Sequence, residues 1–400
     1  MIADSNFFPD FPVSLNILTA VGLFLIAGVL GARLLSRFVP VPAITGYVLT
    51  GLLIGPAGFN LVDTVMLDKL VLLVDLALGV VLFELGRRVD LRWLLREKYL
   101  LATSVGLSMA VFAALFVTLT LFGVTKIVAT MVASIGMAAS PAVAMSVVGE
   151  ANAEGQMSER FLNMVVIGNV LGFIGFSMGL SALHLEYQAG WIGYVLHPLY
   201  LLIGSAALGW LAGQLLILLA SLLGRDRLAQ LIIIIALIAA TVGVALMLQL
   251  SALIALLAFG IASRSQDKSY ALVELDYKPY SSLLYVALFV FAGARLDLSN
   301  LRELAPLIIA FILVRFSVMI LVTSATARAN GLTLRKGVLL GLALMPLSGF
   351  KVILVQHAAG AYPQFNTDLA ALMTSMLVIL EIVGPLCTRY ALVKSGETNA

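Results

Sequence analysis

The sequence predicts an all-α, polytopic membrane protein with about thirteen transmembrane helices, arranged as two inverted repeats with crossed broken helices. Of its 400 residues, 62% are hydrophobic and only 11% are charged. The mean hydropathy is +1.09, far above that of domains with a water-facing surface. Apolar segments of about 20 residues, the length of a membrane span, follow one another along the chain. A polar motif and two kinds of helix interruption also recur at a nearly constant offset.

Polar residues, Gly and Pro divide the chain into thirteen apolar segments. The first is preceded by no Lys or Arg, so it lacks the basic start of a cleaved signal peptide and is interpreted as a mature helix. We expect a single transmembrane domain over residues 1–400, without a soluble regulatory domain. The expected helices cover residues 13–37, 42–55, 67–87, 99–123, 125–149, 157–183, 193–223, 228–248, 251–264, 279–296, 301–327, 334–360 and 366–390.

The distribution of Lys and Arg predicts the orientation of these helices. With the N-terminus outside, 18 of the 24 basic residues fall in loops on the inner side and 4 in loops on the outer side. The other 2, Arg315 and Lys351, lie inside apolar segments. Because basic loops stay on the cytoplasmic side, we expect the N-terminus outside, the C-terminus in the cytoplasm, and the protein in the cell (inner) membrane.

A repeated motif predicts internal symmetry. The third segment ends in Gly-x-Arg-hydrophobic-Asp-Leu at residues 86–91, and the tenth segment ends in the same pattern at residues 293–298. The second and ninth segments are both short and contain Gly, and the fifth and twelfth both contain Pro. Because the offset is seven helices, the second copy enters the membrane inverted. We expect repeat one at about 13–183, a connector helix at about 193–223 and repeat two at about 228–390.

The two Pro-containing segments predict the position of a binding site. Backbone groups freed at Ser140-Pro141 and at Pro346-Leu347-Ser348 are tolerated at membrane depth only beside protein or a water-filled cavity. Opposed half-helix dipoles can hold an ion there, with Ser140 and Ser348 as hydroxyl ligands. One interruption alone would be better explained as a kink that permits close packing. Two at matching positions favour a site.

Ionisable residues within the apolar segments are the next candidates, because a charge at bilayer depth is costly and usually functional. Arg315 lies near the middle of the eleventh segment, and Lys351 lies just past the interruption of the twelfth. Asp75 lies half-way along the third segment, and Glu381 well inside the last. Structural alternatives stay open: Arg315 can satisfy helix-end carbonyls, Lys351 can extend to the interface, and Glu381 can pair with either base.

Composition excludes several other classes of protein. Cys387 is the only cysteine, so no intrachain disulfide is possible, and no Cys/His cluster has the spacing of a metal site. The basic residues lie in loops and form no stripe for nucleic acid. We expect no enzymatic activity, no cofactor and no metal centre. The expected partners are the lipid bilayer and small ions.

Three phrases resemble the membrane domain of the monovalent cation:proton antiporter superfamily, the sodium/hydrogen exchanger-like proteins. They are PAITGYVLTGLLIGP at residues 42–56, LFELG at 82–86 and DLR at 90–92. Together with the thirteen segments, the resemblance covers nearly the whole chain. It implies exchange of Na⁺ or K⁺ for protons by alternating access, in which a core bundle of broken helices moves against a flatter bundle. It also implies a homodimer.

The resemblance places three roles on this sequence. In the family, the sixth helix supplies a carboxylate, the fifth and twelfth cross as unwound chains, and the eleventh supplies a Lys or Arg. These roles fall on Asn169, on Ser140-Pro141 and on Arg315. Asn169 departs from the pattern, because an amide cannot ionise and so cannot alternate between cation and proton.

The Asn169 departure leaves three alternatives open. Another acid, Asp75 or Glu381, can carry the proton in a cation:proton antiporter with a non-standard site. Alternatively, the protein is an anion or weak-acid transporter. In the third alternative it no longer transports, and serves as a membrane-embedded interaction or sensor protein.

Overall fold

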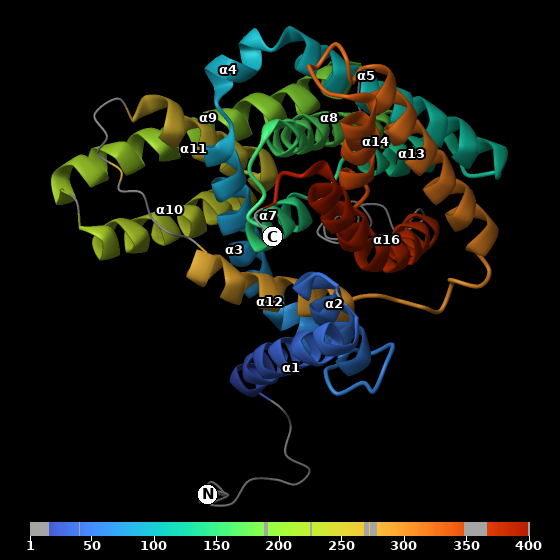
Figure 1. Ribbon diagram of the computed structural model, residues 1–400, viewed down its shortest axis with the longest axis horizontal. Coiled ribbons are helices and arrows are strands. Elements are labelled where there is room, and N and C mark those ends of the chain that lie inside the picture. Colours follow the sequence, from blue (N-terminus) through green and yellow to red (C-terminus); the bar gives the residue numbers. More distant parts are fainter. Residues whose placement is uncertain are drawn as a thin grey trace, which may run out of the picture.

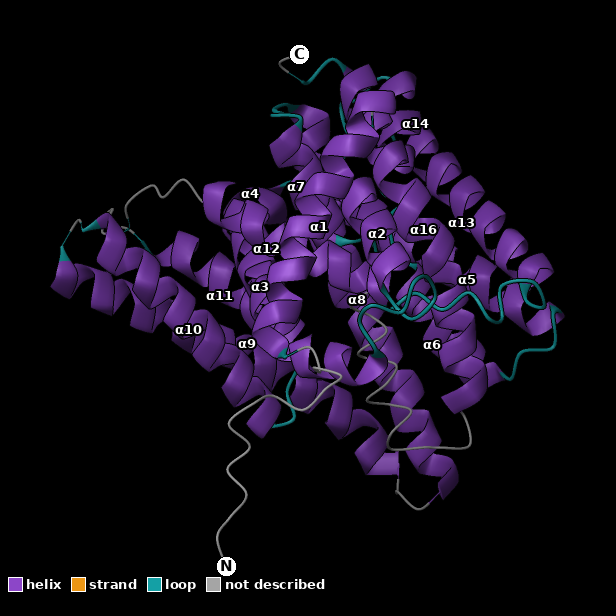
Figure 2. Cartoon of the chain, turned by 90° about the horizontal axis from the view of Figure 1, so that it is seen from below, coloured by secondary structure: helices purple, strands orange, loops and turns teal. Residues whose placement is uncertain are grey.

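A computed structural model of the chain describes residues 16–39, 41–187, 191–224, 226–267, 272, 278–347 and 366–398 (Figure 1). Helices make up nearly all of this described part, as Figure 2 shows. They are α1 Ile17–Phe38, α2 Ala43–Ile54, α3 Thr64–Arg88, α4 Leu91–Arg96, α5 Lys98–Leu121, α6 Lys126–Gly136, α7 Pro141–Glu150, α8 Gln156–Tyr187, α9 Trp191–Leu223, α10 Arg227–Met247, α11 Ala252–Gln266, α12 Lys278–Ala294, α13 Ala305–Ala325, α14 Leu334–Ala343 and α16 Asn366–Ser395.

The predicted segments coincide with these helices, which confirms the all-α, multi-span fold class. Within the described residues, eight helical stretches are long and apolar enough to cross a membrane. The fifth segment is split into the half-helices α6 and α7, and the first half of the twelfth is α14. The short helix α4 was not predicted from the sequence. Asp90 starts it, because its carboxylate accepts hydrogen bonds from the N–H groups of Arg92 and Trp93.

The helices form two bundles joined by a long connector. In the first, α5, α6, α7, α8, α13, α14 and α16 pack on one another; we call this the core bundle. In the second, α1, α2, α3, α10, α11 and α12 pack together; we call this the scaffold bundle. The connector α9 packs along α10 and α11 and also touches α8. Figure 1 shows α1, α2 and α12 beneath the core helices α13, α14 and α16.

The recurring motif marks one helix crossing that the scaffold makes twice. A Cβ on Gly86 of α3 would lie 2.4 Å from the carbonyl oxygen of Leu257 in α11. A Cβ on Gly293 of α12 would lie 2.0 Å from the carbonyl oxygen of Val48 in α2. Each motif glycine therefore lets its helix touch the backbone of the short helix of the other repeat, as small residues do in membranes. The motif that recurs in the sequence thus corresponds to a helix–helix contact that recurs in the structure.

A stripe of glycines on α8 brings the end of α6 close to it. A Cβ on Gly172 would lie 2.8 Å from the carbonyl oxygen of Ser134, and one on Gly175 would lie 2.6 Å from Ser134 Oγ. Side chains at these positions would push α6 away. Asn169 precedes Gly172 by about one turn, so the same close approach sets Asn169 beside the place where α6 ends.

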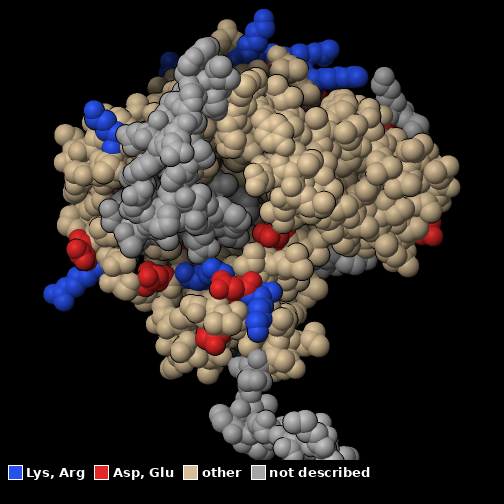
Figure 3. Space-filling model, turned by 180° about the vertical axis from the view of Figure 1, so that it is seen from behind, with Lys and Arg blue, Asp and Glu red and all other residues tan. Residues whose placement is uncertain are grey.

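The helix ends with basic loops share one face, which we call the basic face. It is formed by the ends of α3 and α11 and the starts of α8 and α14. There, Arg264 donates to the carbonyl oxygens of Arg87 and Arg88 at 3.0 and 2.6 Å. At the other end of α3, Arg295 Nη2 lies 2.5 Å from Asp68 Oδ1. In Figure 3, basic side chains gather along the upper edge and many acidic ones lie in the lower half.

The end of the chain is fastened to the basic face through Glu397. Its carboxylate accepts from the N–H groups of Met157 and Ser158 at 3.0 and 2.9 Å, from Ser158 Oγ at 3.0 Å and from Lys336 Nζ at 2.6 Å. A Cβ on Gly155 would lie 2.3 Å from Glu397 Cδ, so the glycine makes room for the carboxyl group. Glu397 therefore ties the first turns of α8 and α14 together.

We predict that Glu397→Gln lowers the free energy of unfolding by about 1–2 kcal/mol at pH 7, because an amide replaces charge-assisted hydrogen bonds. Burial alone would raise the pKa of this carboxyl, but hydrogen bonds from Lys336, Met157 and Ser158 lower it overall from the usual 4.5. The stabilisation is therefore present above about pH 4.5 and is lost as the pH falls through the lowered pKa. Thermal unfolding in detergent between pH 7 and pH 3.5 measures this.

The matched control for Glu397→Gln is Glu154→Gln, which changes an exposed carboxyl just before α8. We expect the control to unfold like the unmodified protein at every pH. A gap between Glu397→Gln and the unmodified protein that stayed constant down to pH 3.5 would contradict the ionised role of Glu397.

Candidate functional site

The two interrupted helices meet inside the core bundle. Helix α6 ends at Gly136 and α7 begins at Pro141, while α14 ends at Ala343 shortly before Pro346. The N–H group of Ser140 donates to the carbonyl oxygen of Pro346 at 2.8 Å. The unwound chains are therefore in direct main-chain contact, and we call this place the crossing.

Local sequence explains the start of α7 at the crossing. Ser140 is the N-cap residue, and its hydroxyl accepts a hydrogen bond from the N–H group of Val143 at 3.3 Å. Pro141 occupies the first helical position, where its missing N–H group and fixed φ angle cost nothing. Both side chains are buried, with Ser140 only 2% exposed. The Ser-Pro pair therefore ends the unwound stretch that follows α6 and starts the half-helix α7.

Arg315 fills the space between the ends of α6 and α14 and is completely buried. Its Nε donates to the carbonyl oxygen of Gly136 at 2.6 Å, and its Nη1 donates to that of Met345. Its Nη2 donates to the carbonyl oxygens of Ala138 and Leu344 at 3.4 and 3.2 Å. The guanidinium thus lies at the negative ends of two half-helix dipoles and satisfies carbonyls that have lost their helical partners.

Asn169 of α8 binds the unwound chain from the other side. Its Nδ2 donates to the carbonyl oxygens of Ala139 and Val165, both at 2.7 Å. Because both neighbours are acceptors, the amide nitrogen must face them, and the oxygen Oδ1 must face away. Oδ1 is buried and accepts no hydrogen bond from the described residues. Asn169 therefore offers a buried carbonyl oxygen next to the crossing.

Glu381 lies on the face of α16 that packs against the second unwound chain. A Cβ on Gly384 would lie 2.6 Å from the Cα of Pro346, and the Thr388 hydroxyl donates to the carbonyl oxygen of Ala343 at 2.9 Å. Positions 381, 384 and 388 share one face of a helix. The Glu381 side chain is only 2% exposed. Asp75, the other predicted acid, is half-buried in the scaffold helix α3.

The structure thus brings together part of the predicted set. Ser140, Pro141, Arg315 and Asn169 lie at the crossing, and Glu381 is one turn from the contact with Pro346. Ser348 and Lys351 lie outside the described residues. Helix-end carbonyls were expected as one alternative for Arg315, and the structure shows which ones it binds. The carbonyls bound by Asn169, and Thr388, were not predicted. A signal for Thr388 exists, since it is a polar residue one turn after Gly384-Pro385 within an apolar helix.

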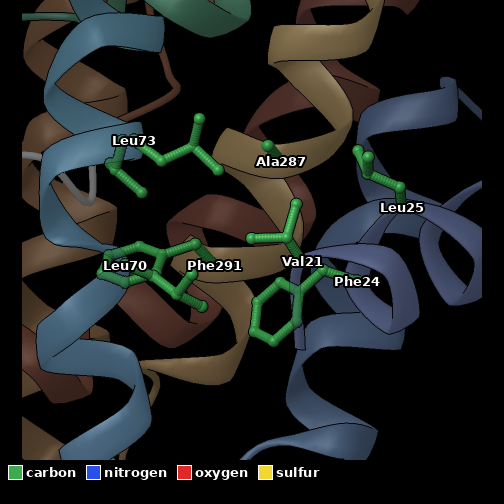
Figure 4. A pocket seen from close by; sticks show the side chains of 8 residues that line it. Val21, Phe24, Leu25, Leu70, Leu73, Ala287 and Phe291 are labelled. Atoms are coloured by element: carbon green, nitrogen blue, oxygen red, sulfur yellow. The ribbon is translucent and has the colours of Figure 1, made fainter. Parts of the chain in front are cut away.

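An apolar hollow elsewhere in the molecule is unsuited to binding ions. It lies between α1, α3 and α12 in the scaffold bundle, and Figure 4 shows aromatic and aliphatic side chains around it. No polar side chain lines it. The lining residues are Val21, Phe24, Leu25, Leu70, Leu73, Val74, Ala287 and Phe291.

Crossed half-helices with a buried guanidinium at membrane depth define a multi-pass membrane protein built like a secondary transporter. The chain belongs to the sodium/hydrogen exchanger family, whose transmembrane region matches residues 22–394. No curated protein shows significant sequence similarity to it. Membership confirms the resemblance found in the sequence.

Two solved structures of the sodium proton antiporter MjNhaP1 from Methanocaldococcus jannaschii share the fold. The structure at pH 8 is 17% identical, with a TM-score of 0.66 over 94% of this chain and 95% of that one. The electron-microscopy structure is 15% identical, with a TM-score of 0.69 over 96% of each chain. At this identity the similarity extends to the fold.

Proposed function

We propose that the protein is a monovalent cation:proton antiporter in which Glu381 carries the exchangeable proton. Membership of the sodium/hydrogen exchanger family supports the exchange of Na⁺ or K⁺ for protons. The observation that carries the site assignment is the buried Glu381 carboxyl on the face of α16 that packs on Pro346, while Pro346 is hydrogen-bonded to Ser140. A buried carboxyl beside freed main-chain groups can bind either a proton or a cation.

Asn169 has a different role in this proposal from the family carboxylate. Its Oδ1 is an uncharged oxygen ligand for the cation, and its Nδ2 holds the unwound chain through Ala139. The charge that a cation requires would come from Glu381 rather than from α8. Asn169 thus supplies geometry and one ligand, and Glu381 supplies the titratable group.

The anion alternative is less well supported, because Arg315 is already engaged. A guanidinium has five N–H donors, and main-chain carbonyls accept from all three of its nitrogens. To bind a substrate anion, Arg315 would have to leave carbonyls at two helix ends unsatisfied, which is costly at membrane depth. We assign Arg315 the task of holding the crossing together.

We place the protein in the cell membrane with the basic face in the cytoplasm. The support is the excess of basic residues in loops on that side, 18 against 4. Transport then requires the core bundle to move against the scaffold bundle, so that the crossing opens to each side in turn. A homodimer stays a prediction of the family resemblance.

Glu381→Gln tests the proposal, because glutamine keeps the shape but cannot exchange a proton. In proteoliposomes with an internal pH dye, we expect Na⁺- or K⁺-driven proton movement to fall at least about a hundredfold, as when an essential proton carrier is removed. The comparison variant is Asp75→Asn, which neutralises the other predicted acid. Full exchange by Glu381→Gln, with exchange lost in Asp75→Asn, would transfer the role to Asp75.

The remaining outcomes separate the other functions. Flux driven by chloride or acetate, without a response to Na⁺ or K⁺, would favour the anion transporter. The absence of any flux from well-folded unmodified protein would leave the interaction or sensor protein. Both results would contradict cation:proton antiport.

A further inference from the structure

The C-terminal end of α7 carries an acid that its own helix does not need. Glu150 is the last residue of α7, where the helix dipole favours a basic side chain and disfavours a carboxylate. A local preference that is broken in this way often marks a functional position. We therefore expect the Glu150 carboxylate to bind a group outside α7.

Glu150 binds the first turn of α2, which belongs to the other bundle. Its Oε2 accepts from the N–H group of Ala43 at 3.2 Å. Pro42 is the N-cap residue of α2 and provides no side-chain hydrogen bond, so the positive dipole end of α2 has no cap from its own N-cap side chain. A carboxylate from the core bundle thus caps a scaffold helix.

The other oxygen of Glu150 faces a base of the core bundle. Arg389 of α16 lies 3.9 Å from Oε1, and both side chains are 36% exposed. Arg389 thus lies on the side of the carboxylate opposite Ala43 and helps to orient it across the boundary between the bundles. Helices α2 and α16, and α3 and α7, also touch across this boundary.

Ala43 and Glu150 are each held by a rigid part of the molecule. Helix α2 is fixed in the scaffold, since a Cβ on Gly46 would lie 2.4 Å from the Cα of Ala32, and one on Gly51 would lie 2.0 Å from the carbonyl oxygen of Val290. Helix α7 has 10 residues and starts at the crossing, so Glu150 lies about 15 Å from it along one straight half-helix. A displacement of the crossing relative to the scaffold must therefore move Glu150 relative to Ala43.

We propose that Glu150 is a gate residue: its bond to the N–H group of Ala43 closes the basic-face end of the path between the bundles, and it breaks each time the core moves to open that end. This rests on the proposed alternating-access function. Such a bond biases the equilibrium between the closed and open forms without binding the transported ion itself. The gate is built from one carboxylate, one helix start and one supporting arginine.

The first experiment measures opening without measuring transport. Cys387 is the only cysteine, so Cys387→Ser gives a cysteine-free background. In that background, Thr45→Cys places a thiol in the first turns of α2, where Thr45 is 2% exposed. We expect Glu150→Ala to accelerate labelling by a water-soluble maleimide about three- to tenfold, as for the loss of one charged hydrogen bond at a partly exposed site.

The control for labelling is Glu159→Gln, which removes an exposed carboxyl at the start of α8. It is expected to label at the rate of the Thr45→Cys parent. Equal labelling rates with and without Glu150→Ala would overturn the gate. Accelerated labelling in a protein whose unmodified form exchanges no cations would keep the gate and reject the proposed antiport, so the two failures are distinguishable.

The second experiment asks whether the bond must break during transport. The double variant Ala43→Cys/Glu150→Cys, in the Cys387→Ser background, is expected to form a disulfide on mild oxidation and to lose at least about 90% of cation-driven proton flux, because the two ends can no longer separate. Reduction should restore the flux. The pair Ala43→Cys/Glu154→Cys is the control, expected not to cross-link. Failure to cross-link, or full flux while cross-linked, would overturn the proposal.

Discussion

Replacing Arg315 with methionine is expected to lower the free energy of unfolding by about 4 kcal/mol or more, which is enough to prevent recovery of much of the folded protein. The change leaves the carbonyl oxygens of Gly136, Ala138, Leu344 and Met345 without their donor. Each buried carbonyl left unsatisfied costs about 1–3 kcal/mol. The midpoint of thermal aggregation in detergent, followed by size-exclusion chromatography, measures the loss.

Arg328→Met is the matched control, because Arg328 follows the end of the same helix and is exposed. Its effect should stay within about 0.5 kcal/mol. Arg315→Lys should rescue only in part, since an ammonium is a point charge without the planar fork that reaches both half-helices. Equal stability of Arg315→Met and Arg328→Met would show that the crossing is held by other groups.

The effect of Arg315 on stability shows how much a sequence can say about such a site. Its depth in an apolar segment was sufficient to single it out, because charges at that depth are rare. Helix-end carbonyls were expected as one alternative, but the particular carbonyls were not predictable, since every residue has one and it carries no sequence signal. Only the structure shows that α6 ends at Gly136, four residues before Ser140, so that several carbonyls are freed rather than one.

The glycines and prolines of the fold were more informative than its polar residues. Gly86 and Gly293 were found as parts of a repeated motif, and both turn out to mark the same helix crossing. Pro141 was predicted to interrupt its helix and does so. These residues act on the backbone locally, which is why their effect can be read from sequence.

Side-chain assignments across helices were harder to predict. Glu381 had several possible partners in the sequence, and its face toward Pro346 follows only from the contacts of Gly384 and Thr388. Glu150 raised no expectation, because it lies just after the predicted segment 125–149 and its partner is a backbone N–H group 107 positions earlier. The roles of Ser348 and Lys351 stay predictions.

The second large effect is expected for Asn169→Asp, which places a carboxyl where the family resemblance predicts one. In the position of the present Nδ2, a carboxylate oxygen would face the carbonyl oxygens of Ala139 and Val165 at 2.7 Å. Oxygens repel at this distance unless a proton lies between them. The introduced carboxyl therefore either holds a proton and binds the unwound chain, or loses it and turns toward a cation.

This alternation is the coupling that the amide lacks, so Asn169→Asp is expected to raise pH-dependent exchange of Na⁺, K⁺ or Li⁺ about tenfold or more in a pH-jump assay. The variant should also exchange protons in the Glu381→Gln background, because it supplies a second titratable group at the crossing.

Asn163→Asp is the matched control. It makes the same change at a buried position of α8 where Asn163 Nδ2 donates to the carbonyl oxygen of Glu159, away from the unwound chain. If Asn169→Asp exchanged no faster than Asn163→Asp, the position of Asn169 would not be that of the family carboxylate. Glu381 alone would then supply the charge that binds the ion at the crossing.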